Sequence, residues 1–148
     1  MLRTKLLFWV FFFLAFLVHC GAGSSLDFET TTVVLQSITG STTVFAEVAD
    51  TEEKREEGLS GRLTLSDSSG MLFVFDEPDV YTFTMQDTYI SLDIIFISEE
   101  KLVIDFEENT TPLVLTSITP NNEILYALEV NAGFVEANGI AIGDVVVF

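Results

Sequence analysis

The chain has 148 residues, of which 23 are acidic and six are basic, and its net charge is −17 at neutral pH. This length allows one domain plus a targeting segment. The charge argues against nucleic acid as a partner, because neutralising a phosphate backbone requires a stripe of Lys and Arg side chains, and it argues equally against anionic lipid headgroups.

The first 20 residues have the composition of an export segment. Arg3 and Lys5 precede 13 uninterrupted apolar residues at positions 6–18, and the first acidic residue is Asp27. Thirteen residues suit the apolar part of a signal peptide and fall short of the ~20 that a helix needs to span a bilayer. We therefore expect residues 1–20 to be a signal peptide or membrane anchor, with the remaining chain on the extracytoplasmic side of a membrane.

Three fates of this segment remain open. Leu17-Val18-His19-Cys20 resembles a bacterial lipobox, in which the cysteine is lipidated and becomes the new N-terminus, although His19 stands where Gly, Ala or Ser is usual. Cleavage after Ala22 or Gly23 without lipidation would give a secreted or periplasmic protein. An uncleaved segment would stay in the membrane as an anchor.

The chain beyond the export segment is dominated by strand patterns. After a linker over residues 21–31, we expect residues 32–148 to form a single β-rich domain. Residues 32–38 and 43–49 are rich in β-branched side chains and flank Thr39-Gly40-Ser41-Thr42, which predicts a hairpin.

Two short helices are expected between strands. Asp50 is predicted to start the first, with Glu53 at its third position as in a capping box, and Gly58 is predicted to end it. The second is expected within residues 131–138, where Asn138-Gly139 would stop it.

Further short strands follow these turn signals along the chain. The expected strands are residues 71–75, 81–85, 94–97, 102–106, 113–118, 123–130 and 145–148. Residues 94–97 (IIFI) are apolar throughout, which predicts that both faces of that strand are covered. The whole pattern indicates a mainly β fold, either a sandwich or a partly closed barrel with two short helices.

Several catalytic chemistries are absent from the expected domain. The only histidine is His19 and the only cysteine is Cys20, both at the export segment. Serine–histidine and cysteine–histidine catalysis, zinc sites made of His and Cys, and disulfide bonds are therefore excluded. No phosphate-binding glycine loop or dinucleotide fingerprint occurs, so no cofactor is expected. Carboxylate-pair catalysis and hard-cation sites remain open.

A series of motifs along residues 47–144 resembles a known family. The motifs are Glu47-Val48-Ala49-Asp50-Thr51, Gly58-Leu59-Ser60-Gly61-Arg62, Gly70-Met71-Leu72-Phe73-Val74-Phe75, Phe83-Thr84-Met85-Gln86-Asp87-Thr88, Ser91-Leu92-Asp93-Ile94-Ile95-Phe96, Leu128-Glu129-Val130-Asn131-Ala132-Gly133 and Gly143-Asp144. In order and spacing they resemble the family catalogued as domain of unknown function 192, whose members are often exported. The resemblance implies a β-rich, sandwich-like fold and no established activity.

The chain departs from the family pattern at several positions. Ser60 stands where the family usually has Met, and Thr84, Gln86 and Asp87 stand where Trp, Lys and Asn are usual. If the family's site is built around the segment at residues 84–88, this member lacks an aromatic wall and a cation there.

Polar residues within the motifs are the candidates for a ligand site. We name Arg62, Met85, Asp87, Thr88, Asp93 and Asp144. Arg62 is the only cation within these motifs, and its guanidinium can take a carboxylate in a bidentate pair. The structural alternative is that Arg62 pairs with Asp93 or another acid and holds the sheet together.

The sequence predicts a small exported or membrane-tethered binding or accessory domain, with a small-molecule or protein ligand that it does not identify. The alternative is a hydrolase that uses carboxylates, with or without a hard divalent cation. Two carboxylic acids facing each other in an open pocket would favour the enzyme. A cluster neutralised by Arg62 would favour the binding or structural hypothesis.

Overall fold

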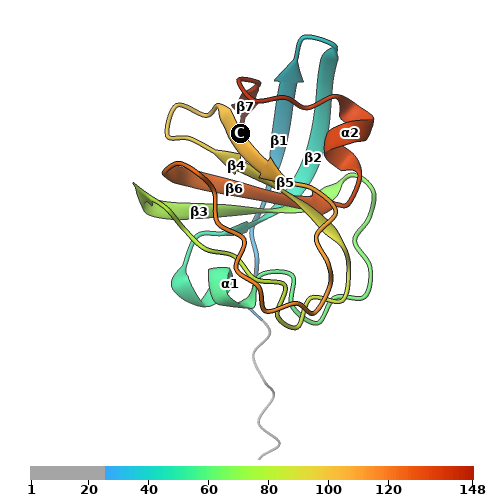
Figure 1. Cartoon of the computed structure of the whole chain (residues 1–148), viewed down its shortest axis with the longest axis vertical. Helices are drawn as coiled ribbons and strands as arrows, with labels where there is room; N and C mark the ends of the chain where they lie inside the picture. Colours follow the sequence, from blue (N-terminus) through green and yellow to red (C-terminus); the bar gives the residue numbers. More distant parts are fainter. Residues whose placement is uncertain (1–25) are drawn as a thin grey trace, which may run out of the picture.

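The computed structural model describes residues 26–148 (Figure 1). The predictions for the export segment and for Cys20 concern residues outside this range. No helix of the part that the structure describes is both long and apolar enough to cross a membrane.

Seven strands form one curved sheet, a half-barrel, and two short helices accompany it (Figure 1). The strands are β1 (Thr30–Ser37), β2 (Gly40–Ala49), β3 (Ser69–Asp79), β4 (Leu92–Ile97), β5 (Val103–Glu107), β6 (Ile124–Asn131) and β7 (Val145–Val147). Their order in the sheet is β5-β4-β6-β3-β2-β1-β7. A single bridge between Leu102 and Val145 links its two edges. The expected β-dominated fold is confirmed, with one curved sheet rather than two facing sheets.

The predicted hairpin is confirmed, with a tighter turn than expected. β1 and β2 pair antiparallel as far as Ser37 and Gly40, which leaves only Ile38 and Thr39 between the strands. The Ser37 hydroxyl accepts a hydrogen bond from the Thr39 backbone N–H at 3.1 Å. This local bond closes the turn, and so the strands continue through residues that the sequence assigned to a loop.

A crossover that contains helix α1 (Glu52–Glu57) joins β2 to β3. These two strands are parallel, whereas every other neighbouring pair is antiparallel, and a parallel pair requires such a crossover. The helix begins one residue later than predicted, because the N-cap is Thr51, whose hydroxyl accepts from the Lys54 N–H at 3.3 Å. Gly58 ends the helix at a φ of 49°, as expected.

Two of the predicted strands are wrong. Residues 81–85 and 113–118 share only one bridge, between Phe83 and Ile118, and belong to no strand of the sheet. Phe83 and Met85 are instead buried against the outer face of the sheet, as part of the cluster that contains Phe73 and Phe96. The alternating pattern arose because this segment lies flat on a sheet face, which buries every second side chain as a strand would.

Apolar side chains cover both faces of the sheet. On β4, Ile95 and Ile97 join the inner cluster, which helix α2 (Phe134–Asn138) and Val146 also line, whereas Ile94 and Phe96 join the outer cluster. All six residues of β4 are buried, which confirms the expectation from its continuous apolar run. The outer cluster is covered by loops and by α1, and this covering contains the cleft described next.

Candidate functional site

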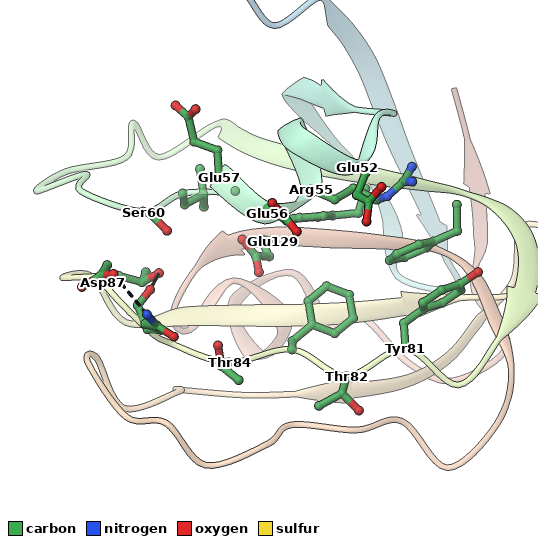
Figure 2. A pocket seen from close by; sticks show the side chains of 17 residues that line it. Glu52, Arg55, Glu56, Glu57, Ser60, Tyr81, Thr82, Thr84, Asp87 and Glu129 are labelled. Carbon is green, nitrogen blue, oxygen red and sulfur yellow. Dashed lines mark hydrogen bonds between the residues drawn. The ribbon is translucent and has the colours of Figure 1, made fainter. Parts of the chain in front are cut away.

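A cleft of about 480 Å³ opens on the outer face of the sheet, over β3 and β6 (Figure 2). One side is formed by α1 and the turn after it, and the other side by the segment at residues 81–88. The residues that line it are Glu52, Arg55, Glu56, Glu57, Gly58, Leu59, Ser60, Phe73, Phe75, Tyr81, Thr82, Phe83, Thr84, Gln86, Asp87, Thr88 and Glu129.

Aromatic rings line one end of the cleft. The Phe75 and Tyr81 rings stack at a centroid distance of 3.6 Å, and Phe83 meets the Phe73 ring edge-on at 5.6 Å. The Arg55 guanidinium lies 5.5 Å from the centroid of the Phe75 ring. This Arg already has partners, since it donates to the Val74 carbonyl at 2.7 Å and lies 3.5 Å from an Asp76 carboxylate oxygen. The end of the cleft is therefore apolar, with a cation that is largely compensated.

Glu129 lies in the cleft, on the central strand β6. Its neighbours across the sheet are Met71 on β3 and Ile94 on β4, both fully buried and apolar. The Glu129 residue is only 6% exposed. Figure 2 shows its carboxyl group pointing into the cleft, between α1 and the segment that carries Thr84.

Burial raises the pKa of Glu129 to about 8. Removal from water is the only cause, because no hydrogen bond and no charged neighbour among residues 26–148 contributes to the shift. Glu129 is therefore mainly protonated at neutral pH, and its carboxylic acid has no protein partner. A perturbed acid in a concave site is a typical sign of a functional residue.

The mouth of the cleft is acidic. Glu52, Glu56 and Glu57 project from α1, and Asp87 lies on the opposite side (Figure 2). Besides Glu129, four acidic residues and one Arg therefore line the cleft, and this Arg is already paired with Asp76. This arrangement favours cationic over anionic molecules at the entrance.

Arg62 holds the turn that forms one side of the mouth. Its guanidinium donates to both carboxylate oxygens of Glu47 on β2, each at 2.6 Å. The hydrogen bonds with Arg62 lower the pKa of Glu47, and the same bonds raise the pKa of Arg62. The Gly61 N–H donates to the Asp87 carbonyl at 2.8 Å, which joins this turn to the opposite side of the cleft. Arg62 thus forms the bidentate pair expected of it, with Glu47 as the partner rather than Asp93.

The other predicted site residues fall into two groups. Asp87 and Thr88 line the cleft, and Met85 lies beneath them, 2% exposed in the outer cluster. Asp93 and Asp144 do not line it. Asp93 accepts hydrogen bonds from the backbone N–H groups of Asn109 and Val135, and Asp144 accepts one from Ala141. The carboxylates of Asp93 and Asp144 therefore hold backbone N–H groups of loops and, for Asp93, of the first turn of α2.

The four positions that differ from the expected family pattern all line the cleft, namely Ser60, Thr84, Gln86 and Asp87. The residue that sequence reasoning missed is Glu129. A single acidic residue within the apolar strand ILYALEV was the available signal, because a charged group there needs a special reason. In the part of the chain that the structure describes, no group of three or more His, Cys, Asp or Glu is arranged to hold a metal ion.

Comparison with known proteins settles the relationship. The family model for domain of unknown function 192, described as "Uncharacterized ACR", matches residues 34–148. The chain belongs to this family. A search of curated proteins gave no significant match.

Two solved structures of similar proteins share the fold. One, from Sinorhizobium meliloti 1021, is described as a proposed transcription regulator; it has a TM-score of 0.80 and 30% identity, over 83% of this chain and 96% of that one. The other, from Novosphingobium aromaticivorans DSM 12444, is a protein of unknown function; it has a TM-score of 0.80 and 32% identity, over 88% and 91% of the two chains. The domain of unknown function 192 family thus has a known fold and no established activity.

Proposed function

We propose that this protein is a small-molecule-binding domain and that its ligand enters the cleft above Glu129. The observation that carries the proposal is the buried, protonated and unpartnered carboxyl group at the cleft. None of the buried side-chain N and O atoms of the described residues lacks a hydrogen-bond partner, so the Glu129 carboxyl, which has no protein partner, still reaches solvent through the cleft. A ligand in the cleft can therefore form a direct hydrogen bond with Glu129, in a poorly hydrated surrounding where such a bond is stronger than in water.

The surroundings of Glu129 also suit a small ligand. A volume of about 480 Å³ lies within the range of ordinary ligand pockets. Phe73, Phe75 and Phe83 offer apolar contact area, while Thr82 and Thr84 offer hydroxyl groups that can orient a ligand. Ordinary ligand sites have mostly apolar walls with a few convergent polar groups. This cleft has its apolar rings at one end and carries more polar surface than such sites, because acidic and hydroxyl side chains line the rest of it.

The test is to fill the cleft from one side. We expect Thr84→Trp to abolish ligand binding, because Thr84 lines the cleft and a Trp ring would occupy part of its volume. Thr116→Trp, at an exposed position outside this cleft, is the matched control and should bind as the wild type does. Binding is measured by ligand-observed NMR with a library of small aromatic and aliphatic fragments. Fragments that bind both Trp variants equally would place the binding site elsewhere.

A carboxylate hydrolase is the second candidate, and it rests on the same residue. A carboxylic acid that stays protonated at neutral pH can act as a general acid, while an ionised carboxylate at the mouth of the cleft could act as base or nucleophile. Glu129→Gln separates the two functions. Gln keeps the shape of a protonated carboxyl and can still donate a hydrogen bond, so neutral molecules would still bind, but it cannot transfer a proton, so hydrolysis of an aryl glycoside panel would be lost.

The description of the Sinorhizobium protein as a proposed transcription regulator does not transfer well to this chain. Residues 26–148 contain four basic and 23 acidic residues, hence a net charge of −19. A domain with that charge lacks the basic surface that DNA binding requires. We propose instead that residues 1–20 take the domain across a membrane, where Cys20 tethers it through a lipid or the segment is cleaved or retained.

A further inference from the structure

We propose that the ligand of the cleft is an organic cation, a primary or secondary amine with an apolar body, whose ammonium group binds the Glu129 carboxylate. This inference rests on the proposed function of the cleft and names the class of its ligand. It follows from three features of the cleft: the carboxyl group at its floor, the aromatic rings at its end and the acidic mouth.

The carboxyl group at the floor has no positive partner in the protein. Arg55 is the only cation that lines the cleft, and it is occupied by the Val74 carbonyl and by Asp76. Arg62 is occupied by both oxygens of Glu47. Neither Arg of the described residues is available to Glu129, so a positive charge that binds Glu129 would come from a ligand.

The aromatic rings suit the rest of such a molecule. The ring centroid of Phe83 lies 5.6 Å from that of Phe73 and 6.2 Å from that of Phe75, and all three rings line the same cleft as Glu129. Ring faces attract cations, and the apolar body of an amine gains by leaving water against them. An inorganic cation would bind the carboxylate but would gain nothing from the apolar surface of these rings.

The charged and titratable groups that face Glu129 select against anions. They are Glu52, Arg55, Glu56, Glu57, Tyr81 and Asp87. Neighbouring strands β3 and β4 contribute no further charge beside Glu129, because Met71 and Ile94 are the residues next to it. An anion would meet four carboxyl groups at the mouth, whereas a cation is attracted by them.

Binding is coupled to release of a proton. The Glu129 carboxylic acid loses its proton to solvent, and the ammonium group of the ligand then donates hydrogen bonds to the carboxylate that remains. Because the pKa of Glu129 is about 8, only about a tenth of the protein is ionised at pH 7 before the ligand binds. The apparent affinity for a cation should therefore rise about tenfold from pH 6 to pH 7 and level off above pH 8.

The experiment compares three probes of equal size: benzylamine, which is cationic, benzyl alcohol, which is neutral, and benzoate, which is anionic. Binding is followed by protein NMR shifts of cleft residues at pH 6, 7 and 8, and proton release by calorimetry in two buffers of different ionisation enthalpy. We expect benzylamine to bind most tightly, with proton release and the tenfold rise, and benzoate most weakly. Glu129→Gln should remove both the preference for benzylamine and its pH dependence. Glu107→Gln, the same substitution at an exposed position of β5 outside this cleft, should remove neither.

The outcomes separate this inference from the function on which it rests. If benzyl alcohol binds in the cleft at least as tightly as benzylamine and without pH dependence, the cation inference is overturned and the small-molecule cleft stands. If none of the probes shifts cleft residues, both are overturned. If benzylamine binds equally well to Glu129→Gln, the acidic mouth rather than Glu129 attracts it, and the proposed partner is wrong.

Discussion

At the scale of single residues, Glu129 illustrates how a strand can force a carboxyl group into an apolar surrounding. The alternation of β6 sends Leu128 and Val130 to the inner cluster, and so it sends Glu129 to the outer face. There it neighbours Met71 and Ile94 and gains no hydrogen bond from the described part of the chain. Burial of such a group lowers the free energy of unfolding at every pH at which the same group would be ionised in water.

This weakening gives a dependence of stability on pH. The pKa of Glu129 is raised to about 8 from an ordinary value of 4.5, so between these values the folded state holds a proton that the unfolded state has released. The free energy of unfolding therefore falls as pH rises through this window, by up to about 1.4 kcal/mol per pH unit, and levels off above pH 8. Urea unfolding between pH 5 and pH 9 measures the slope.

Glu129→Gln should flatten that slope and be more stable than the wild type at pH 8, because the amide is never ionised. Glu107→Gln is the control for the substitution itself, because Glu107 is exposed, and it should leave the slope unchanged. Wild type and Glu129→Gln unfolding with parallel pH profiles would show that Glu129 is ionised in the folded protein.

At the scale of elements, the turn after α1 is the best example of a loop held in place by a charged pair. Arg62 joins it to β2 through Glu47, and the Gly61–Asp87 hydrogen bond joins it to the segment that faces it across the cleft. The side chains of Arg62 and Glu47 are 29% and 30% exposed, so the pair is neither buried nor free in solvent. The Arg62–Glu47 pair therefore stabilises the turn at the mouth of the cleft, and neither residue lines the cleft itself.

We expect Arg62→Ala to lower the free energy of unfolding by about 1–3 kcal/mol, between the values for exposed and for buried pairs. Arg62→Lys should recover only part of this, because an ammonium group cannot bind both oxygens of Glu47 in the same planar geometry. Since the pKa of Glu47 is lowered, the contribution is present above pH 4.5 and is lost as the pH falls through that lower pKa. Urea unfolding at pH 7 is the measurement.

The control for Arg62 is Lys54→Ala, which removes an i,i+4 pair with the half-exposed Asp50 and should cost less than about 1 kcal/mol. Equal unfolding curves for Arg62→Ala and Lys54→Ala would mean that the Glu47–Arg62 pair contributes no more than a surface pair.

At the scale of the whole molecule, the charge of the domain bears on the proposed export of the chain by residues 1–20. A net charge of −19 over residues 26–148 keeps the domain soluble and repels it from anionic membrane surfaces. A stable position at a membrane would therefore depend on residues 1–20 or on a lipid at Cys20, rather than on the domain surface. Two acyl chains, in contrast to one, are enough for stable anchoring.

The lipid hypothesis is tested on the membrane fraction of cells that make the full chain. If Cys20 is lipidated, intact mass measurement should find a mature protein that begins at Cys20 and carries the added lipid mass, and Cys20→Ser should release the protein or stall its processing. A mature N-terminus at Gly23 or Ser24 without lipid would end the lipoprotein proposal and favour ordinary cleavage.

Elements whose signals are local can be predicted from the amino-acid sequence alone. The hairpin of β1 and β2, the end of α1 at Gly58 and the fully covered strand β4 follow from neighbouring residues, and all three are confirmed. The family was likewise readable from the order and spacing of motifs. Local backbone preferences and apolar periodicity are sufficient for such features.

Which surfaces face each other depends on contacts between distant parts of the chain, and these contacts cannot be read from local patterns. Residues 81–85 alternate like a strand, yet they lie on a face of the sheet, because burial of every second side chain requires a flat apolar surface and not a strand partner. Residues 113–118 bury no side chain and share only the bridge between Phe83 and Ile118 with that segment. Arg62 could have paired with any acid until the crossover brought it to Glu47. Glu129 became the centre of the cleft only because α1 and residues 81–88 close over β6 from distant parts of the chain, and the desolvation that raises its pKa depends on that covering.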